Sequence, residues 1–120
     1  MSNQELIRIA NEWFSAFNNH DLDRLLSLYH DDAEHYSPKL KVRRQETSGL
    51  IKGKTELRAW WLDSFDRIPS LKYIVINLMP FENKIFMEYI RKADGDEDLR
   101  VGETLEVKDG QIIFSRVYHS

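Results

Sequence analysis

The sequence predicts a single α+β domain, residues 1–120, in which helices pack on one face of a curved antiparallel sheet. Three observations carry this prediction. Helical periodicity dominates the first half of the chain, strand-like alternation dominates roughly the last 50 residues, and no repeat or Pro/Gly/Ser-rich linker divides the two. A chain of 120 residues also has the length of one ordinary domain.

Three helices are expected before the sheet. The first begins at the capping-box serine Ser2 and runs to about Asn18, where asparagine residues favour a stop. Asp21 caps a second, shorter helix, and a third runs from about Lys54 to just before Pro69. Their apolar faces are, in order, Leu6, Ile9, Ala10, Trp13, Phe14 and Phe17, then Leu22, Leu25, Leu26 and Tyr29, then Leu57, Trp60, Trp61 and Phe65.

The remaining segments are predicted to be extended. Residues 33–37 form a short strand ended by Pro38, and residues 39–52 are expected to be a loop plus an edge strand. Short connections between four later strands predict an antiparallel meander. These strands are Leu71–Met79, Lys84–Arg91, Leu99–Val107 and Gln111–His119.

One charged residue breaks the pattern of the third meander strand. Leu99, Val101, Leu105 and Val107 share one face, and period-two alternation puts Glu103 in the middle of it. An ionised carboxylate in an apolar interior must find a partner or raise its pKa. Carboxylates placed in this way are candidates for general acid or base catalysis.

The turn after this strand leaves two interpretations of Glu103 open. A two-residue type I′ turn at Asp109-Gly110, which the Asp-Gly pair favours, sets Glu103 opposite Arg116 and predicts a buried ion pair. A three-residue loop with a bulge at Gly110 instead sets Glu103 opposite Ser115 and predicts an acid facing a pocket.

Several segments together resemble the ketosteroid-isomerase and SnoaL-like polyketide cyclase group of the nuclear-transport-factor-like superfamily. They are Asn18-Asn19-His20-Asp21-Leu22-Asp23 between two helices, Tyr29-His30-Asp31-Asp32-Ala33 before the strand ending at Pro38, Ile51-x-Gly53 before a helix, and Val107-Lys108-Asp109-Gly110-Gln111-Ile112. The resemblance implies a cone, with a strongly bent sheet wrapped around three helices and a ligand pocket between them. This scaffold hosts isomerases, cyclases, dehydratases, hydrolases and non-catalytic binders.

The resemblance carries over to this chain only in part. The isomerase acid that donates a hydrogen bond to the substrate oxygen falls on Glu103, the catalytic tyrosine of the first helix falls on Trp13, and the aspartate base falls on Ser37. A serine cannot abstract a carbon-bound proton unaided, so steroid isomerisation by that mechanism is not expected. The same alignment turns His35 and Ser37 inward and puts His119 at the pocket rim.

We therefore predict that Glu103 and His35 are catalytic, as a carboxyl with a raised pKa and a histidine that titrates near neutrality. The expected chemistry is of the isomerase, dehydratase or hydrolase type on a compact, largely apolar substrate. The predicted substrate-binding residues are Trp13, Ser37, Tyr89 and His119. The alternatives are a non-catalytic ligand-binding or dimeric accessory protein with the same fold, and a structural protein in which Glu103 and Arg116 form a buried pair.

Composition excludes several other classes. With no cysteine, the chain has neither disulfides nor a cysteine nucleophile, and its net charge of −3 argues against a nucleic-acid coat. No apolar run is long enough to cross a bilayer, and the amino terminus lacks the pattern of a signal peptide, so a cytoplasmic protein is expected. The sequence contains no cofactor motif, and residues 30–35 straddle a helix end and a strand start, so no metal site is expected.

Two surface features concern partners. The last strand carries large apolar side chains on both faces, which predicts a homodimer formed through the outer face of the sheet. Residues 39–58 hold seven basic and two acidic side chains, and the run Lys39–Arg44 alternates basic and apolar residues. This run is either a solvated loop or a surface that steers an anionic substrate to the mouth of the cone.

Overall fold

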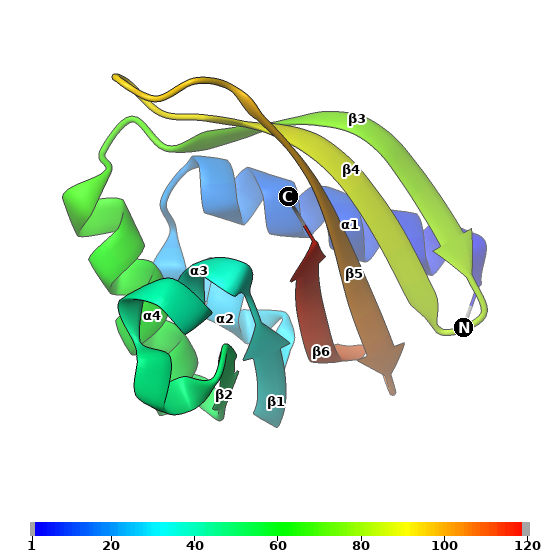
Figure 1. Ribbon diagram of the computed structural model, residues 1–120. Helices are drawn as coiled ribbons and strands as arrows, with labels where there is room; N and C mark the ends of the chain where they lie inside the picture. Colours follow the sequence, from blue (N-terminus) through cyan, green and yellow to red (C-terminus); the bar gives the residue numbers. More distant parts are fainter. Residues whose placement is uncertain (1, 119–120) are drawn as a thin grey trace.

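The chain folds in the predicted order, helices first and a strongly bent sheet afterwards (Figure 1). A computed structural model describes residues 2–118. The three predicted helices are α1 (Asn3–Asn18), α2 (Leu22–Ser27) and α4 (Lys54–Arg67). Helix α1 lies within the curve of the sheet and packs against β3 and β4 (Figure 1). This is the α+β cone that the resemblance implied.

Six strands make up the sheet, in the spatial order β2-β1-β6-β5-β4-β3. Their bounds are β1 Tyr29–Tyr36, β2 Leu50–Lys52, β3 Lys72–Phe81, β4 Lys84–Lys92, β5 Leu99–Lys108 and β6 Gln111–Tyr118. The last four strands form the predicted antiparallel meander, and β2 is the predicted edge strand. The pairing of β1 with β6 is parallel, so the sheet is mixed.

A short helix, α3 (Pro38–Arg43), occupies part of the segment expected to be a loop, and a 3₁₀ turn over Gln45–Thr47 follows it. The side chain of Ser37 caps α3 by accepting a hydrogen bond from the backbone N–H of Lys39 at 3.2 Å. Proline at the first helical position is also a start signal. Periodicity failed to predict the helix because it has six residues and buries only Leu40.

The β5–β6 hairpin follows neither predicted register at Glu103. Asp109 and Gly110 both have positive φ and form a two-residue turn, with Lys108 paired to Gln111. The pairing then shifts by one residue, which leaves Ile113 as a β-bulge. As a result Glu103 lies opposite Val117, and both predicted partners were wrong.

The bulge also moves Arg116 away from the interior. Arg116 pairs with Thr104, and its guanidinium lies 4.9 Å from the ring centre of Tyr36 and 4.8 Å from that of Phe114. A one-residue register shift reverses the face on which each side chain lies. The predicted buried pair between Glu103 and Arg116 is therefore wrong.

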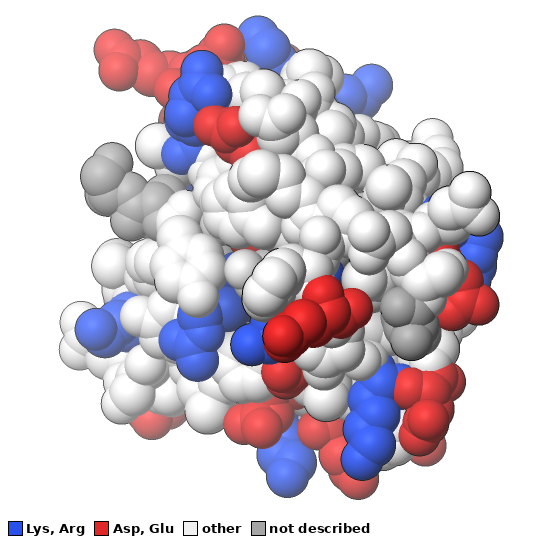
Figure 2. Space-filling model, turned by 90° about the vertical axis from the view of Figure 1, so that its right-hand side faces the viewer, with Lys and Arg blue, Asp and Glu red and all other residues white. Residues whose placement is uncertain are grey.

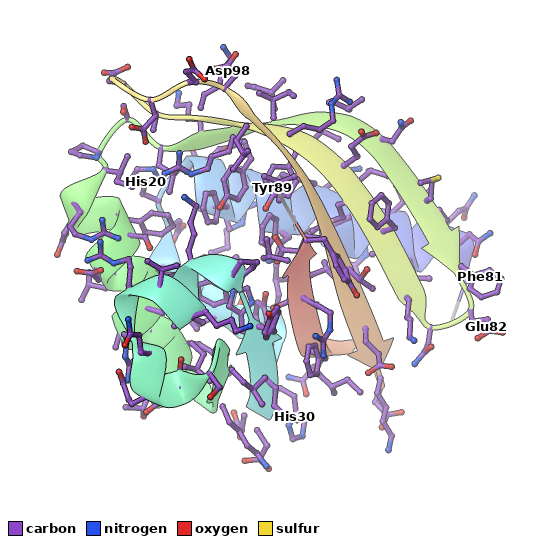
Figure 3. All side chains as sticks on the ribbon, in the orientation of Figure 1. His20, His30, Phe81, Glu82, Tyr89 and Asp98 are labelled. Atoms are coloured by element: carbon purple, nitrogen blue, oxygen red, sulfur yellow. The ribbon has the colours of Figure 1, made fainter. Side chains whose placement is uncertain are left out.

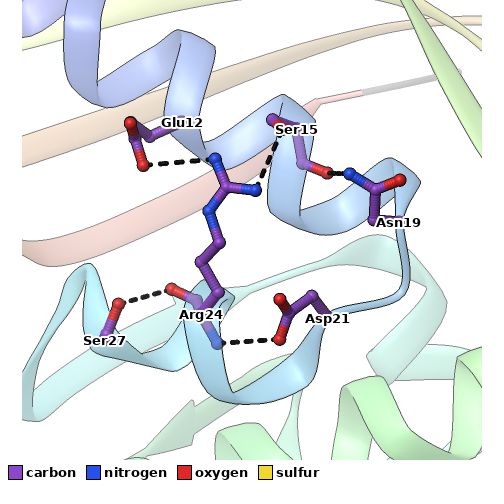
Figure 4. A network of polar contacts seen from close by, with 6 residues as sticks. All are labelled: Glu12, Ser15, Asn19, Asp21, Arg24 and Ser27. Atoms are coloured by element: carbon purple, nitrogen blue, oxygen red, sulfur yellow. Dashed lines mark hydrogen bonds and ion pairs between the residues drawn. The ribbon is translucent and has the colours of Figure 1, made fainter.

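Polar contacts fix the corner between α1 and α2 (Figure 4). The Asp21 carboxylate accepts a hydrogen bond from the backbone N–H of Arg24 at 3.2 Å, which caps α2 as predicted. The Arg24 guanidinium reaches Ser15 Oγ at 3.1 Å and Glu12 Oε2 at 3.4 Å, both on α1. This corner leads the chain into β1. Among residues 2–118, no helix combines the length and apolar character that crossing a membrane requires.

Candidate functional site

A cavity of about 490 Å³ lies between the inner face of the sheet and the helices. This volume falls within the range of small-molecule pockets, about 300–1,000 Å³. Figure 3 shows Tyr89 in the interior between the sheet and α1, whereas Phe81 and Glu82 project from the β3–β4 hairpin tip. Aromatic side chains dominate the wall of the cavity: Trp13, Phe17, Trp60, Trp61, Tyr73 and Tyr89.

The cavity brings together five of the six residues predicted to form the site. They are Trp13, His35, Ser37, Tyr89 and Glu103. His119, the sixth, lies outside the described residues. Glu103 comes from β5 and His35 from β1, two strands that β6 separates in the sheet. The bend of the sheet thus allows one cavity to be lined by both.

The Glu103 carboxyl is buried in the cavity wall, with 1 % of its surface exposed. Its Oε1 accepts a hydrogen bond from the Tyr89 hydroxyl at 2.8 Å, while its Oε2 has no hydrogen-bond partner among residues 2–118. Burial raises the pKa of Glu103 to about 8, and the Tyr89 hydrogen bond limits the rise. At neutral pH the carboxyl is therefore protonated, with Oε2 as the oxygen free to carry the proton.

A chain of buried hydrogen bonds leads to His35. The indole Nε1–H of Trp13 donates to the Tyr29 hydroxyl at 3.0 Å, and that hydroxyl donates to Ser115 Oγ at 3.0 Å. Ser115 Oγ lies 2.6 Å from His35 Nδ1. Trp13 therefore uses its polar atom within the protein and offers only its ring to the cavity.

The direction of these hydrogen bonds assigns the tautomer of His35. An indole N–H can only donate, so the protons point from Trp13 through Tyr29 to Ser115. The Ser115 hydroxyl then needs an acceptor, and His35 Nδ1 supplies it, which leaves the imidazole proton on Nε2. The opposite tautomer would leave a buried hydroxyl proton without an acceptor.

The pKa of His35 differs from the value near neutrality that the sequence predicted. Burial lowers the pKa of His35 to about 3, and an interaction with the backbone of Ser115 opposes the shift only in part. The ring is therefore neutral at physiological pH, and the expected titration near neutrality is wrong. Through Nε2–H, His35 can act as a neutral hydrogen-bond donor.

Sequence reasoning missed three residues of this site: Tyr29, predicted only as core, Ser115 as the central link of the chain, and Arg91. Arg91 lies on the inner face of β4 and is 8 % exposed. Its alternation with Ile85, Met87 and Tyr89 is the same signal that singled out Glu103. Within residues 2–118, no group of three or more His, Asp or Glu side chains is arranged to hold a metal ion.

A bent sheet that curves around helices and encloses one aromatic cavity defines a cone-shaped α+β pocket protein. The family model for the SnoaL-like domain matches residues 10–114. The chain therefore belongs to the SnoaL-like family, and the sequence resemblance to that family is confirmed. No protein with a curated description matches the sequence significantly.

Solved structures with the same fold include a SnoaL-like protein of unknown function from Burkholderia thailandensis, which is 24% identical, with a TM-score of 0.86 and coverage of 100% of this chain and 98% of that one. A putative polyketide cyclase from Sinorhizobium meliloti is 16% identical, with a TM-score of 0.81 and coverage of 98% and 100%. TerC, co-crystallised with polyporic acid, is 13% identical, with a TM-score of 0.83 and coverage of 97% and 92%. At these identities the likeness concerns the fold.

Proposed function

We propose that this protein binds a compact, largely apolar small molecule in the cavity and carries out acid–base chemistry on it. The reaction would be of the isomerase, dehydratase or hydrolase type, with Glu103 as the group that gives or takes the proton. One observation carries the proposal: a carboxyl buried among aromatic rings has one oxygen with no hydrogen-bond partner in the part of the chain that the structure describes, residues 2–118. A buried polar group left in this way marks a place for a ligand atom.

Two neutral donors are available to a substrate oxygen in this mechanism. Glu103 donates through Oε2–H, and His35 donates through Nε2–H. Such donors stabilise negative charge that develops on a carbonyl or hydroxyl oxygen. As the pH approaches 8, a growing fraction of Glu103 is ionised and can accept a proton.

The isomerase base has no counterpart in this proposal. The Ser37 hydroxyl, at the position of that base, accepts the backbone N–H of Lys39 and caps α3. Its engagement supports a mechanism that relies on Glu103 instead. The complex of TerC with polyporic acid supports the ligand-binding part, because that neighbour has the same fold and was co-crystallised with an organic ligand.

Nuclear magnetic resonance of candidate substrates in deuterated buffer tests the chemistry. A panel of cyclic ketones, β-hydroxy ketones and aryl esters reports enolisation, dehydration and hydrolysis in one assay. We expect turnover of at least one class by the wild type and a loss of at least 100-fold in Glu103→Gln. Glu106→Gln is the matched control, because Glu106 lies on the outer face of the same strand.

The second candidate function is ligand binding without turnover. The neutrality of His35 favours it, because a group with a pKa of about 3 is a weak base at neutral pH. Ligands that bind to the wild type without exchange, elimination or hydrolysis would support this function and contradict the enzymatic one.

We also propose a homodimer through the outer face of the sheet. That face carries Ile74, Met79, Phe86, Ile90, Phe114 and Tyr118. Figure 2, viewed from the side of the β3–β4 hairpin, shows a broad uncharged area with acidic and basic side chains around it. Sedimentation at micromolar concentration would give twice 14.3 kDa, and a strict monomer would contradict the dimer. The cytoplasmic location stays a prediction.

A further inference from the structure

Four cationic side chains line the cavity together with Glu103. They come from three separate elements: Lys39 and Arg43 from α3, Arg67 from the end of α4, and Arg91 from β4. Val42, on the same helix as Lys39 and Arg43, also lines the cavity and is 75 % exposed, so this side of the cavity is its mouth.

These cations are only partly neutralised. Asp63 binds both Arg67, with Nε at 2.9 Å, and Arg43, with a terminal nitrogen at 3.7 Å. Asp96 pairs with Arg91 at 3.3 Å. Two carboxylates thus face four cations, and within residues 2–118 Lys39 has no salt-bridge partner. An excess of positive charge gathers here in a chain whose formal net charge is −3.

Lys39 is held in an unfavourable position for a cation. Burial is the main cause of its lowered pKa, and the positive charge of Arg91 lowers the pKa further. Only the negative charge of Asp96 raises it. Arg67 and Arg43 add to the repulsion. An anion placed among these side chains would relieve that repulsion, because it supplies the charge that the two aspartates do not.

Arg91 gives the mouth a directional donor. It is more than nine-tenths buried, and within residues 2–118 its side chain makes one hydrogen bond, from Nη1 to Asp96 Oδ2 at 3.3 Å, which leaves the rest of the guanidinium available to a ligand. A planar guanidinium matches the two oxygens of a carboxylate, and partial burial strengthens the contact.

We propose that the mouth binds a carboxylate or similar organic anion, and that the ligand of this cavity is a compact hydrophobic acid with a second oxygen at its far end. The anionic group lies among Lys39, Arg67 and Arg91, the apolar body lies against the aromatic wall, and the second oxygen meets Glu103. This inference rests on the proposed ligand-binding function and names its substrate class.

A matched pair of probes tests the inference. Adamantane-1-carboxylate and adamantane-1-carboxamide share a compact apolar body, and only the first is charged at pH 7. The three tryptophans of the chain, Trp13, Trp60 and Trp61, all line the cavity, so intrinsic fluorescence reports its occupancy. We expect the wild type to bind the carboxylate at least tenfold more tightly than the carboxamide in low salt, with a smaller preference in 0.5 M NaCl.

Charge changes on α3 locate the anion. Lys39→Gln is expected to reduce the preference for the carboxylate at least threefold, and Lys39→Glu to abolish it. Lys41→Gln is the control, because Lys41 is exposed on the same helix and does not line the cavity. Circular dichroism checks that each variant is folded.

The possible outcomes separate this inference from the proposed function. Equal binding of both probes by the wild type would overturn the anion site and leave ligand binding intact. An equal loss of preference in Lys39→Gln and Lys41→Gln would also overturn it, because the effect would then be one of general surface charge. No fluorescence change with either probe would contradict ligand binding as well.

Discussion

Replacing Glu103 by glutamine isolates the effect of one ionisable group on the stability of the fold. The amide keeps the size of the protonated carboxyl and retains an oxygen that can accept the Tyr89 hydrogen bond. It does not titrate. The difference between the two proteins as a function of pH therefore reports the ionisation of Glu103 alone, because His35 contributes equally to both.

The magnitude follows from the shift in pKa from 4.5 to about 8. The folded state holds the proton more tightly than the unfolded state, so the stabilising contribution is complete below pH 4.5 and is lost as the pH rises toward 8. Each pH unit within this window corresponds to about 1.4 kcal/mol. We expect the free energy of unfolding of Glu103→Gln, relative to wild type, to rise by about 3 kcal/mol between pH 5 and pH 7.

Urea unfolding followed by tryptophan fluorescence at pH 5, 6, 7 and 8 measures this difference. Two results would refute the reasoning. A constant difference across this range would mean that Glu103 ionises at its ordinary pKa in the folded protein. A loss of several kcal/mol in the variant at pH 7 would mean that the carboxylate has a cationic partner, since removing one member of a buried pair costs about 3–5 kcal/mol.

Three more variants test the neighbouring contacts. Because the pKa of His35 is lowered in the folded state, the wild type loses stability as the pH falls below 6.5. Between pH 7 and pH 5 its free energy of unfolding should fall by about 2 kcal/mol more than that of His35→Gln, as measured by urea unfolding. An equal pH dependence in both proteins would contradict this. Ser115→Ala leaves the Tyr29 hydroxyl without an acceptor and should lower the free energy of unfolding by about 2 kcal/mol. A change within experimental error would refute the proposed hydrogen bonds from Tyr29 through Ser115 to His35. Tyr89→Phe should raise the pKa of Glu103 further in a carbon-13 titration, and an unchanged midpoint would argue against their hydrogen bond.

The helices and the meander could be predicted because their signals are local. Capping residues such as Ser2 and Asp21 mark helix starts, and the caps are present in the structure. The placement of Glu103 on the inner face followed from alternation within one strand. These features depend on residues close together in the sequence.

The rest of the site depends on contacts between distant segments. The bulge at Ile113 determines that Val117 lies opposite Glu103, and no residue type in β6 predicts this bulge. The chain from Trp13 to His35 crosses α1, β1 and β6, so the low pKa of His35 follows only from the assembled fold. Arg91 is different, because its place on an apolar strand face was visible in the sequence and was overlooked.

The protonation state of Glu103 is the claim on which the proposed chemistry depends. Carbon-13 chemical shifts of the glutamate side-chain carboxyls, titrated from pH 4 to pH 10 with Glu103→Gln to assign the resonance, measure it directly. The structure predicts a midpoint near pH 8 and a protonated carboxyl at neutral pH. A midpoint near 4.5 would contradict the account, because Glu103 would then be a carboxylate at neutral pH and could not donate a proton to a ligand.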